Sequence, residues 1–357
     1  MTTFTVDSDL LGGTIKTLQR IAQVTSISVE VTKGNLLVTG TGNGNSCAIN
    51  LPCKVTEKSA ATKFSIAADT LVNAVAKRKD IKVSIKETSV QVASSRYNVE
   101  LLINQFEKIE VIPDDVKANK SLNLSSKFLD AIRTNLAKIE LKPLLSLYDY
   151  IPIGIKSTDE GTFVACFDTW QSAFFFDKEL TGKLEFTLPS NVFMTIAKEF
   201  KNQSYKLSIT DSTVYAYNDN FELGIALTQT EGEQITLGHM LALYKSLKTD
   251  KSGVKIKLKT EGINQLIENA KAVYEKDSTF TFTTKGNKCK LELKSSFGNM
   301  SSMIMLEEAP DKDVSFSCDF SFFSTLLAKA PATLELRVND RMMLFSHKPV
   351  TYLLSLV

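Results

Sequence analysis

Phe4-Thr-Val-Asp-Ser-Asp-Leu-Leu11 indicates how this 357-residue chain folds, because its pattern recurs along the whole sequence. Each copy has an apolar residue, any residue, an apolar residue, any residue, a helix-start residue, two residues of any kind and a final apolar residue. The further copies lie at 64–71, 122–129, 186–193, 256–263 and 316–323. Self-similarity at a nearly fixed period indicates a repeated structural unit.

Each copy has the sequence of a strand that leads directly into a helix. Its first three residues alternate in polarity, as in a half-buried strand. A side-chain oxygen near the helix start can accept hydrogen bonds from free backbone N–H groups. Four copies supply one: Ser8, Ser126, Ser190 and Thr260. Ala68 and Phe320 stand there in the other two copies, so those helices must begin differently.

Alternating, β-branched sequence follows the predicted helices. Residues 81–103 are predicted to form strands interrupted near Glu87 and Ser94, and residues 205–227 show the same pattern. Turn residues that tolerate positive φ occupy the interruptions. The unit is therefore β-α-β-β-β, present six times, and the predicted fold class is α+β.

Pairs of units form three similar domains, which we predict at residues 1–117, 118–250 and 251–357. A polar stretch that contains proline separates the first two domains at 111–120. A longer stretch, 231–253, separates the second domain from the third. Its apolar residues recur at helical spacing, at Met240, Leu241, Leu243, Tyr244 and Leu247, so we expect a connector helix over 237–249.

Composition excludes several classes of protein. Hydrophobic residues make up 43% and charged residues 23% of the chain, which is ordinary for a globular protein. No apolar run approaches the ~20 residues that span a bilayer, and Asp7 and Asp9 interrupt the only candidate leader. We therefore expect a cytoplasmic protein without a membrane partner. The five cysteines lack CxxC spacing, and only His239 and His347 could join them, so we expect no metal or other cofactor.

Positive charge is concentrated in the predicted helices. Over 8–22, 68–79, 126–138, 190–201, 261–276 and 320–330 we count 13 basic and 7 acidic residues, whereas the net charge of the whole chain is only +2. In the first, third and fourth helices the basic side chains point away from the apolar face. These basic residues could simply increase solubility. However, an excess of basic residues that several related helices share is more typical of a protein with a polyanionic partner.

Repeats in this arrangement resemble the bacterial and phage sliding clamps, the β-type processivity factors of DNA polymerase. Locally, residues 164–173 are similar to the Thr-Asp-Gly-His-Arg-Leu-Ala segment of that family. Asp168 and Ala173 match it, whereas the four residues 169–172 differ. The end, 350–357, is similar to the apolar C-terminal strand of those clamps. The differences indicate a divergent member, of bacterial or phage origin.

The resemblance implies a head-to-tail homodimeric ring with helices inside and sheets outside. With helices ~9–10 Å apart and ~10–12 Å wide, two copies leave a hole of roughly 25 Å, enough for a DNA duplex. It also implies three partners, which are double-stranded DNA bound without regard to sequence, a DNA polymerase and a clamp loader. The side chains expected to face the DNA are Lys16, Arg20, Lys77, Arg78, Lys127, Arg133, Lys138, Lys198 and Lys201.

Clamps of this family bind partner peptides in an apolar cleft between the second and third domains. By resemblance, the candidates for this cleft are Trp170, Gln171, Leu241, Tyr244, Leu247, Tyr352, Leu354 and Leu356. The alternative for the last three is that residues of a terminal strand simply pack in the core.

Other functions have weaker support. The glycine-rich stretch at 40–45 lacks the Gly-Lys-Ser/Thr of a phosphate-binding loop, and neither histidine has a triad-like neighbour in sequence, so we do not expect an enzyme. A structural ring or scaffold would share the repeats without needing basic helices. A third possibility keeps the polymerase role but places a monomer along DNA, and the mass in solution separates it from a ring.

Overall fold

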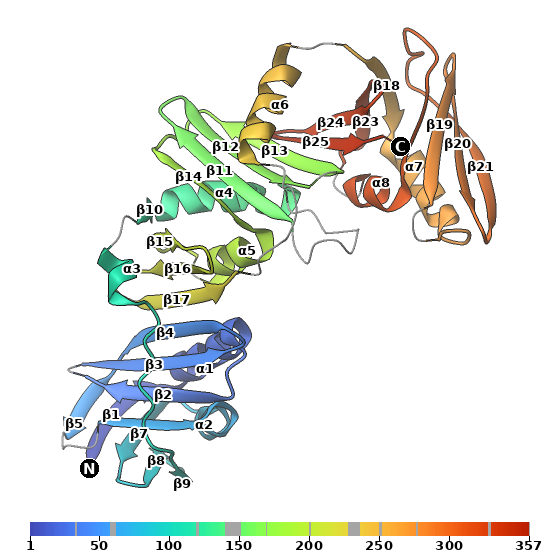
Figure 1. Cartoon of the computed structure of the whole chain (residues 1–357). Coiled ribbons are helices and arrows are strands. Elements are labelled where there is room, and N and C mark those ends of the chain that lie inside the picture. Colours follow the sequence, from blue (N-terminus) through green and yellow to red (C-terminus); the bar gives the residue numbers. More distant parts are fainter. Residues whose placement is uncertain are drawn as a thin grey trace. The chain divides into compact units, whose positions relative to one another are not determined.

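The computed structural model describes residues 1–32, 34–57, 62–118, 121–139, 151–168, 170–199, 201–227, 236–249, 252–275, 278–327 and 330–356 (Figure 1). The chain forms two compact units. Unit 1 comprises Met1–Leu129 and Thr195–Gln229, and unit 2 comprises Asp130–Met194 and Thr230–Val357.

The first half of the chain contains three of the predicted repeats. The first is β1 (Thr2–Asp7), α1 (Ser8–Ala22), β2 (Ser26–Val31), β3 (Asn35–Gly42) and β4 (Asn45–Pro52). The second is β6 (Lys63–Ala67), α2 (Ala68–Val75), β7 (Asp80–Ile85), β8 (Ser89–Ser94) and β9 (Tyr97–Leu102). The third is β10 (Leu122–Leu124), α4 (Ser126–Ile139), β11 (Pro152–Thr158), β12 (Gly161–Phe167) and β13 (Gln171–Asp177).

The second half contains the other three. The fourth is β14 (Leu184–Pro189), α5 (Ser190–Glu199), β15 (Tyr205–Ile209), β16 (Thr213–Tyr217) and β17 (Phe221–Ala226). The fifth is β18 (Val254–Lys259), α7 (Thr260–Ala270), β19 (Thr279–Lys285), β20 (Lys288–Ser295) and β21 (Gly298–Met305). The sixth is β22 (Ser315–Asp319), α8 (Phe320–Leu327), β23 (Thr333–Val338), β24 (Met342–His347) and β25 (Val350–Ser355).

The predicted α+β fold of six β-α-β-β-β repeats is therefore confirmed. Among the described residues, three elements lie outside the repeats: β5 (Lys54–Glu57), α3 (Asp114–Ala118) and α6 (Leu237–Thr249). The last has the bounds predicted for the connector helix. Neither β5 nor α3 was predicted from the sequence.

The described strands form four sheets. Unit 1 holds the five-stranded sheet β5-β1-β7-β8-β9 and the eight-stranded sheet β10-β15-β16-β17-β4-β3-β2-β6. Unit 2 holds the eight-stranded sheet β14-β11-β12-β13-β25-β24-β23-β18 and the four-stranded sheet β21-β20-β19-β22. Both eight-stranded sheets continue across a predicted domain boundary. The division into three domains at 117 and 250 stays a prediction.

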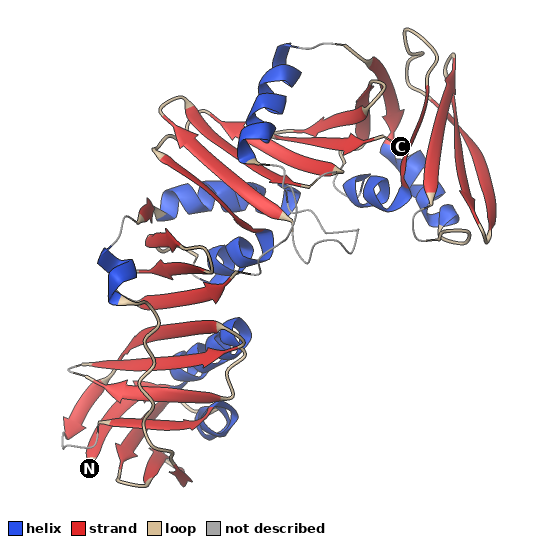
Figure 2. Ribbon diagram, viewed as in Figure 1, coloured by secondary structure: helices blue, strands red, loops and turns tan. Residues whose placement is uncertain are grey.

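The helices cover the sheets with their apolar faces. In α1 the side chains of Leu11, Ile15 and Leu18 are almost completely buried. Figure 2 shows α1 and α2 together against the strands of unit 1, where Gly12 of α1 lies close to Val75 of α2. Leu10 of the same helix is exposed at the surface, outside this apolar face.

Helices α1 and α4 begin at the predicted residues, but the capping side chain of each lies one residue earlier than expected. The carboxylate of Asp7, not the hydroxyl of Ser8, accepts from the backbone N–H of Leu10, and the Ser125 hydroxyl accepts from that of Phe128. Ser8 is buried, and its hydroxyl donates to the carbonyl oxygen of Arg78. A buried hydroxyl needs a hydrogen-bond partner inside the fold, and that of Ser8 finds it in this carbonyl. The preceding residue therefore caps the helix.

Candidate nucleic-acid and partner interfaces

The basic side chains of α1 lie on its solvent side. Lys16 and Arg20 are exposed, opposite the buried face formed by Leu11, Ile15 and Leu18. The Arg20 guanidinium donates to the Thr17 hydroxyl at 3.3 Å. Both cations point where a polyanion could reach them.

The second predicted helix is shorter than expected, and its cations lie in the turn that follows. Helix α2 ends at Val75, Ala76 is extended, and Lys77 has a φ of 58° in the left-handed region. The guanidinium of Arg78 lies over the Tyr97 ring, 3.5 Å from its centroid, a cation–π contact that holds this turn against β9. Lys77 remains exposed.

The observed helix bounds change the numbers of basic and acidic residues that lie inside the helices. With the observed bounds, the six repeat helices contain six basic and six acidic residues, so the predicted excess inside them is absent. The excess lies just beyond helix ends, at Lys77, Arg78, Lys79, Lys201 and Lys271. Cations are favoured there because the helix dipole leaves partial negative charge at the C-terminus. The sequence pattern could not show where backbone dihedrals end a helix.

The third and fourth repeat helices carry the remaining candidates. Lys127, Lys198 and Lys201 are exposed. Arg133 forms an ion pair with Asp130 in the same helix at 2.9 Å, so part of its charge is neutralised. The side chain of Lys138 lies outside the described residues.

Ion pairing distinguishes some lysines of the chain from others. Some strand lysines pair with neighbouring carboxylates, as in Lys63–Glu30 at 2.8 Å and Lys156–Glu185 at 2.7 Å. Across the described parts of the chain, no ion pair is found for Lys16, Lys77, Lys127, Lys198 or Lys201. Exposed, unpaired ammonium groups keep their full attraction for phosphates. Lys271, which follows α7, is paired with Glu268 at 2.7 Å and is therefore a weaker candidate.

In unit 2, α6 packs on one face of the eight-stranded sheet. The Tyr244 ring lies between three phenylalanine rings, with centroid separations of 5.2 Å to Phe163, 5.8 Å to Phe174 and 5.9 Å to Phe176. Leu241 and Leu247 pack against the same cluster and are partly exposed. The α6 residues predicted for the partner cleft are thus brought together on one surface.

The C-terminal strand is oriented differently from the prediction. Tyr352 and Leu354 have no exposed surface, and the side chain that faces the α6 cluster is Leu353. The two predicted residues are therefore core residues, because successive side chains of a strand point to opposite faces. Leu356 is half-buried, and its N–H donates to the Arg341 carbonyl at 2.9 Å.

The other two cleft candidates lie where the hairpin loop meets β13, and their environments differ. Trp170 is 41% exposed, whereas Gln171 is buried. The carboxylate of Asp168 accepts from both backbone N–H groups, at 2.7 and 2.8 Å. Burial raises the pKa of Asp168, and these hydrogen bonds oppose the rise. Trp170 is the only cleft candidate of this loop that a partner could contact.

The sheet side of this surface was not predicted. Phe163, Phe174, Phe176, Met342 and Leu353 all pack with α6. The continuously apolar stretches 163–167 and 173–176 were the available signal, but such a stretch does not show which face of the strand a helix covers.

The described residues show neither a metal cluster nor a membrane span. They contain no group of three or more potential metal-ligating side chains. None of the described helices is long and apolar enough to cross a bilayer. All five cysteines are free thiols, and four of them are buried.

No protein-family model matches the sequence, and no curated protein has a matching sequence. Solved structures do match. The beta subunit from DNA polymerase of Streptococcus pyogenes is 15% identical, with a TM-score of 0.76 over 99% of both chains. The chain has the fold of the bacterial beta clamps.

Two further beta clamps agree with this fold. DNA polymerase III beta chain of Streptococcus pneumoniae is 13% identical, with a TM-score of 0.75 over 100% of both chains. The Helicobacter pylori beta clamp, solved bound to a DNA ligase peptide, is 15% identical, with a TM-score of 0.69 over 99% of both chains. The resemblance predicted from the repeats is therefore confirmed for the fold.

Proposed function

We propose that this protein is a DNA sliding clamp, a non-catalytic ring that encloses duplex DNA and tethers a DNA polymerase to it. The observation that carries the proposal is the match to bacterial beta clamps over 99% of both chains. A match of that extent covers all six repeats. A match to only part of the chain would also have been compatible with a different assembly.

The unpaired lysines support sequence-independent attraction to DNA. Lys16, Lys77, Lys127, Lys198 and Lys201 would contact phosphates, which carry no base information. Arg20, Arg78, Arg133 and Lys138 are weaker candidates. The three arginines have contacts within the chain, and the side chain of Lys138 lies outside the described residues. Enclosure would hold the protein on DNA, so each contact could be weak enough to permit sliding.

The ring would consist of two head-to-tail copies, placed on DNA in the cytoplasm by a clamp loader. A head-to-tail contact closes only when the rotation between copies is right, and three similar domains per copy provide a sixfold pseudo-symmetric arrangement. Tethering raises the effective concentration of the polymerase at the primer end, which is the physical basis of processivity.

Partner proteins would bind at the α6 surface of unit 2. Leu241, Tyr244 and Leu247 supply partly exposed apolar area there, and Trp170 supplies an exposed aromatic ring in the hairpin before β13. The Helicobacter pylori clamp was solved with a DNA ligase peptide. A short apolar peptide of a polymerase or ligase is the partner that this surface would take.

Binding to two duplexes of unrelated sequence, titrated with salt, tests the DNA part of this proposal. A clamp should bind both with equal affinity, and the logarithm of affinity should fall linearly with the logarithm of salt, by ~0.9 for each phosphate contact. A preference for one sequence would contradict the proposal. Absence of binding to both would favour the structural ring or scaffold.

A further inference from the structure

Three of the described hairpins contain the same side-chain contact. In each of them a side-chain oxygen accepts hydrogen bonds from the backbone N–H groups two and three residues further along the chain. Asp168 accepts at 2.7 and 2.8 Å, Asn218 at 2.8 and 3.1 Å, and Asn339 at 3.0 and 2.9 Å. Either aspartate or asparagine can form this contact, which is known as an Asx turn.

The main chain of the three hairpins agrees as well. In each, the N–H group of the residue that supplies the side chain donates to the carbonyl oxygen three residues on, from Asp168 to Gln171, from Asn218 to Phe221 and from Asn339 to Met342. The donor–acceptor distances are 2.9, 2.9 and 3.1 Å. Because two of the three hairpins use a neutral amide, the turn itself does not require a negative charge.

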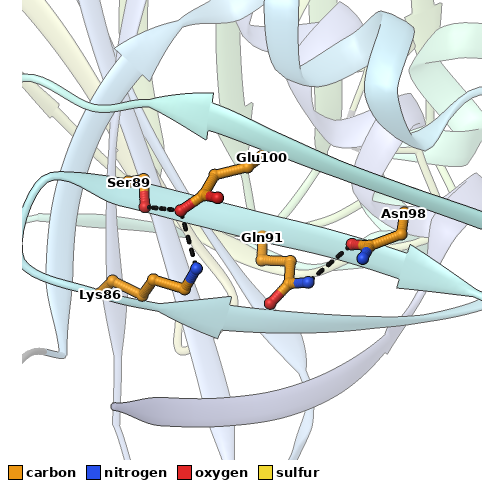
Figure 3. A network of polar contacts seen from close by, with 5 residues as sticks. All are labelled: Lys86, Ser89, Gln91, Asn98 and Glu100. Atoms are coloured by element: carbon orange, nitrogen blue, oxygen red, sulfur yellow. Dashed lines mark hydrogen bonds and ion pairs between the residues drawn. The ribbon is translucent and has the colours of Figure 1, made fainter.

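The negative charge of Asp168 has no cation beside it. Glu100 shows how a carboxylate on a strand of unit 1 is compensated: it accepts from the Lys86 ammonium group at 2.7 Å and from the Ser89 hydroxyl, and these contacts lower its pKa (Figure 3). Asp168 is half-buried and forms no ion pair among the described residues, and burial raises its pKa. A charge at this position costs free energy that an asparagine would avoid.

The second carboxylate oxygen of Asp168 makes a contact that an amide would lose. Oδ2 accepts from Nε2 of the Gln171 side chain at 3.2 Å. An asparagine in the same turn would place its NH₂ group against this donor. At Asn218 the corresponding NH₂ group has an acceptor instead, the carbonyl oxygen of Ser204 at 2.9 Å. The neighbours of Asp168 therefore favour a carboxylate, and those of Asn218 favour an amide.

Among the described residues of the three hairpins, only the loop before β13 carries an exposed aromatic ring, that of Trp170. Its N–H donates to Oδ1 of Asp168 at 2.7 Å, the shortest of the six side-chain contacts, and its carbonyl oxygen accepts from the Ser355 N–H at 2.8 Å. Hydrogen bonds to an ionised acceptor are shorter and about twice as strong as neutral ones. Asp168 thus holds the main chain of a residue whose side chain is available to a partner.

We propose that Asp168 is a positioning residue for partner binding, and that its negative charge holds the Trp170 main chain and the Gln171 amide in place. This role rests on the proposed function of Trp170 as a partner contact. Asp168 itself need not touch the partner. A loop that is ordered before binding loses less conformational entropy when a peptide binds, and the peptide is then held more tightly. If the turn were the only role of Asp168, an amide would serve as well, as it does at Asn218.

Asp168→Asn tests the role of the charge, because it keeps the shape of the side chain and the turn found at Asn218 and Asn339. The variant should bind the DNA ligase peptide of the Helicobacter pylori clamp about fivefold or more weakly, which is the difference between a charged and a neutral acceptor. Equal affinity of the variant and the unchanged protein in calorimetry would overturn the positioning role.

Asn218→Ala is the matched control, because it removes the same two hydrogen bonds from a hairpin of unit 1. Its affinity for the peptide should remain that of the unchanged protein. A loss equal to that of Asp168→Asn would mean that loosening any hairpin weakens binding, and it would contradict a specific role of Asp168.

The single tryptophan provides a readout that needs no partner. Time-resolved fluorescence anisotropy reports the nanosecond motion of the Trp170 ring in the free protein. Asp168→Asn should increase the amplitude of this motion, and Asn218→Ala should leave it unchanged. An equal amplitude in Asp168→Asn and in the unchanged protein would overturn the positioning role.

Acid titration of the unchanged protein checks the same point without a substitution, and so without the risk that a variant fails to fold. Burial raises the pKa of Asp168, and the hydrogen bonds from Trp170 and Gln171 oppose this rise. No charged side chain of the described residues contributes to the shift. As the pH falls through this pKa the carboxylate gains a proton, and the Trp170 ring should become more mobile. An anisotropy that stays constant until the protein unfolds in acid would contradict the role of the charge.

The outcomes separate the positioning role from the partner function. A protein that binds no peptide, but in which Asp168→Asn makes the Trp170 ring more mobile, would support the hold on the loop and contradict the partner surface. A protein that binds the peptide equally well with and without Asp168→Asn would support the partner surface and overturn the positioning role.

Discussion

The backbone N–H of Ser355 donates to the carbonyl oxygen of Trp170 at 2.8 Å, and this bond joins the end of the last strand to the hairpin before β13. It lies at the junction that makes β13 and β25 neighbours in one sheet. The main chain of Trp170 is therefore fixed, while its indole ring remains 41% exposed. A rigid, exposed aromatic ring of this kind is a suitable anchor for a partner peptide.

Trp170 should report partner binding directly. It is the only tryptophan of the chain, so its fluorescence comes from a single position. Adding the DNA ligase peptide bound by the Helicobacter pylori clamp should shift the emission maximum to shorter wavelength, because the indole would leave water. Trp170→Ala should weaken binding of this peptide about tenfold or more in calorimetry.

The matched control for Trp170 is Phe297→Ala, which removes another exposed aromatic ring from a hairpin loop of unit 2. It should leave peptide affinity unchanged. Equal loss of affinity in both variants would place the peptide elsewhere.

Charge reversal at Lys16 and Lys198 should weaken attraction to DNA. Neither forms an ion pair among the described residues, so each substitution removes one available phosphate contact. The slope of the logarithm of affinity against the logarithm of salt should become shallower by ~0.9 for each lysine replaced by glutamate. Binding to labelled duplex at several salt concentrations measures it.

Lys82→Glu makes the same change of charge on a strand of unit 1, where Lys82 is also exposed. Its slope should remain that of the unchanged protein. A loss equal to that of Lys16→Glu would show that only total charge matters, and not the position of the helices.

Tyr244→Ala should loosen α6 from its sheet. The substitution removes one ring from contacts with Phe163, Phe174 and Phe176, and for a half-buried aromatic residue it should cost about 2–3 kcal/mol. Hydrogen exchange should then become faster in α6 (Leu237–Thr249) than in the rest of unit 2. Tyr244→Phe keeps the ring and should retain most of the protection. Unchanged exchange in the alanine variant would refute the anchoring role.

The repeats could be predicted from sequence because their signal is local. A strand that alternates in polarity and a helix with one apolar face each leave a periodic pattern, and six copies reinforce one another. The connector helix was predicted for the same reason, with its bounds at Leu237–Thr249.

The predictions that failed concern structural features that a periodic sequence pattern does not encode. The backbone of Lys77 turns left-handed directly after Ala76, and no residue type at that point announces it. Tyr352 and Leu354 share one face of β25 while Leu353 takes the other, and only the position of α6 shows which face is covered. Strand junctions such as β13 with β25 join segments far apart in sequence, so their register was equally hidden.

Retention on circular DNA is the measurement that tests the clamp most directly. The protein is loaded on a nicked circular duplex with a loader or polymerase extract, washed at moderate salt, and followed before and after the circle is cut. A sliding clamp should be retained on the circle and lost rapidly once the ends are free, because enclosure and not affinity holds the ring. Equal retention on circular and linear DNA would mean ordinary electrostatic binding and would contradict the clamp function.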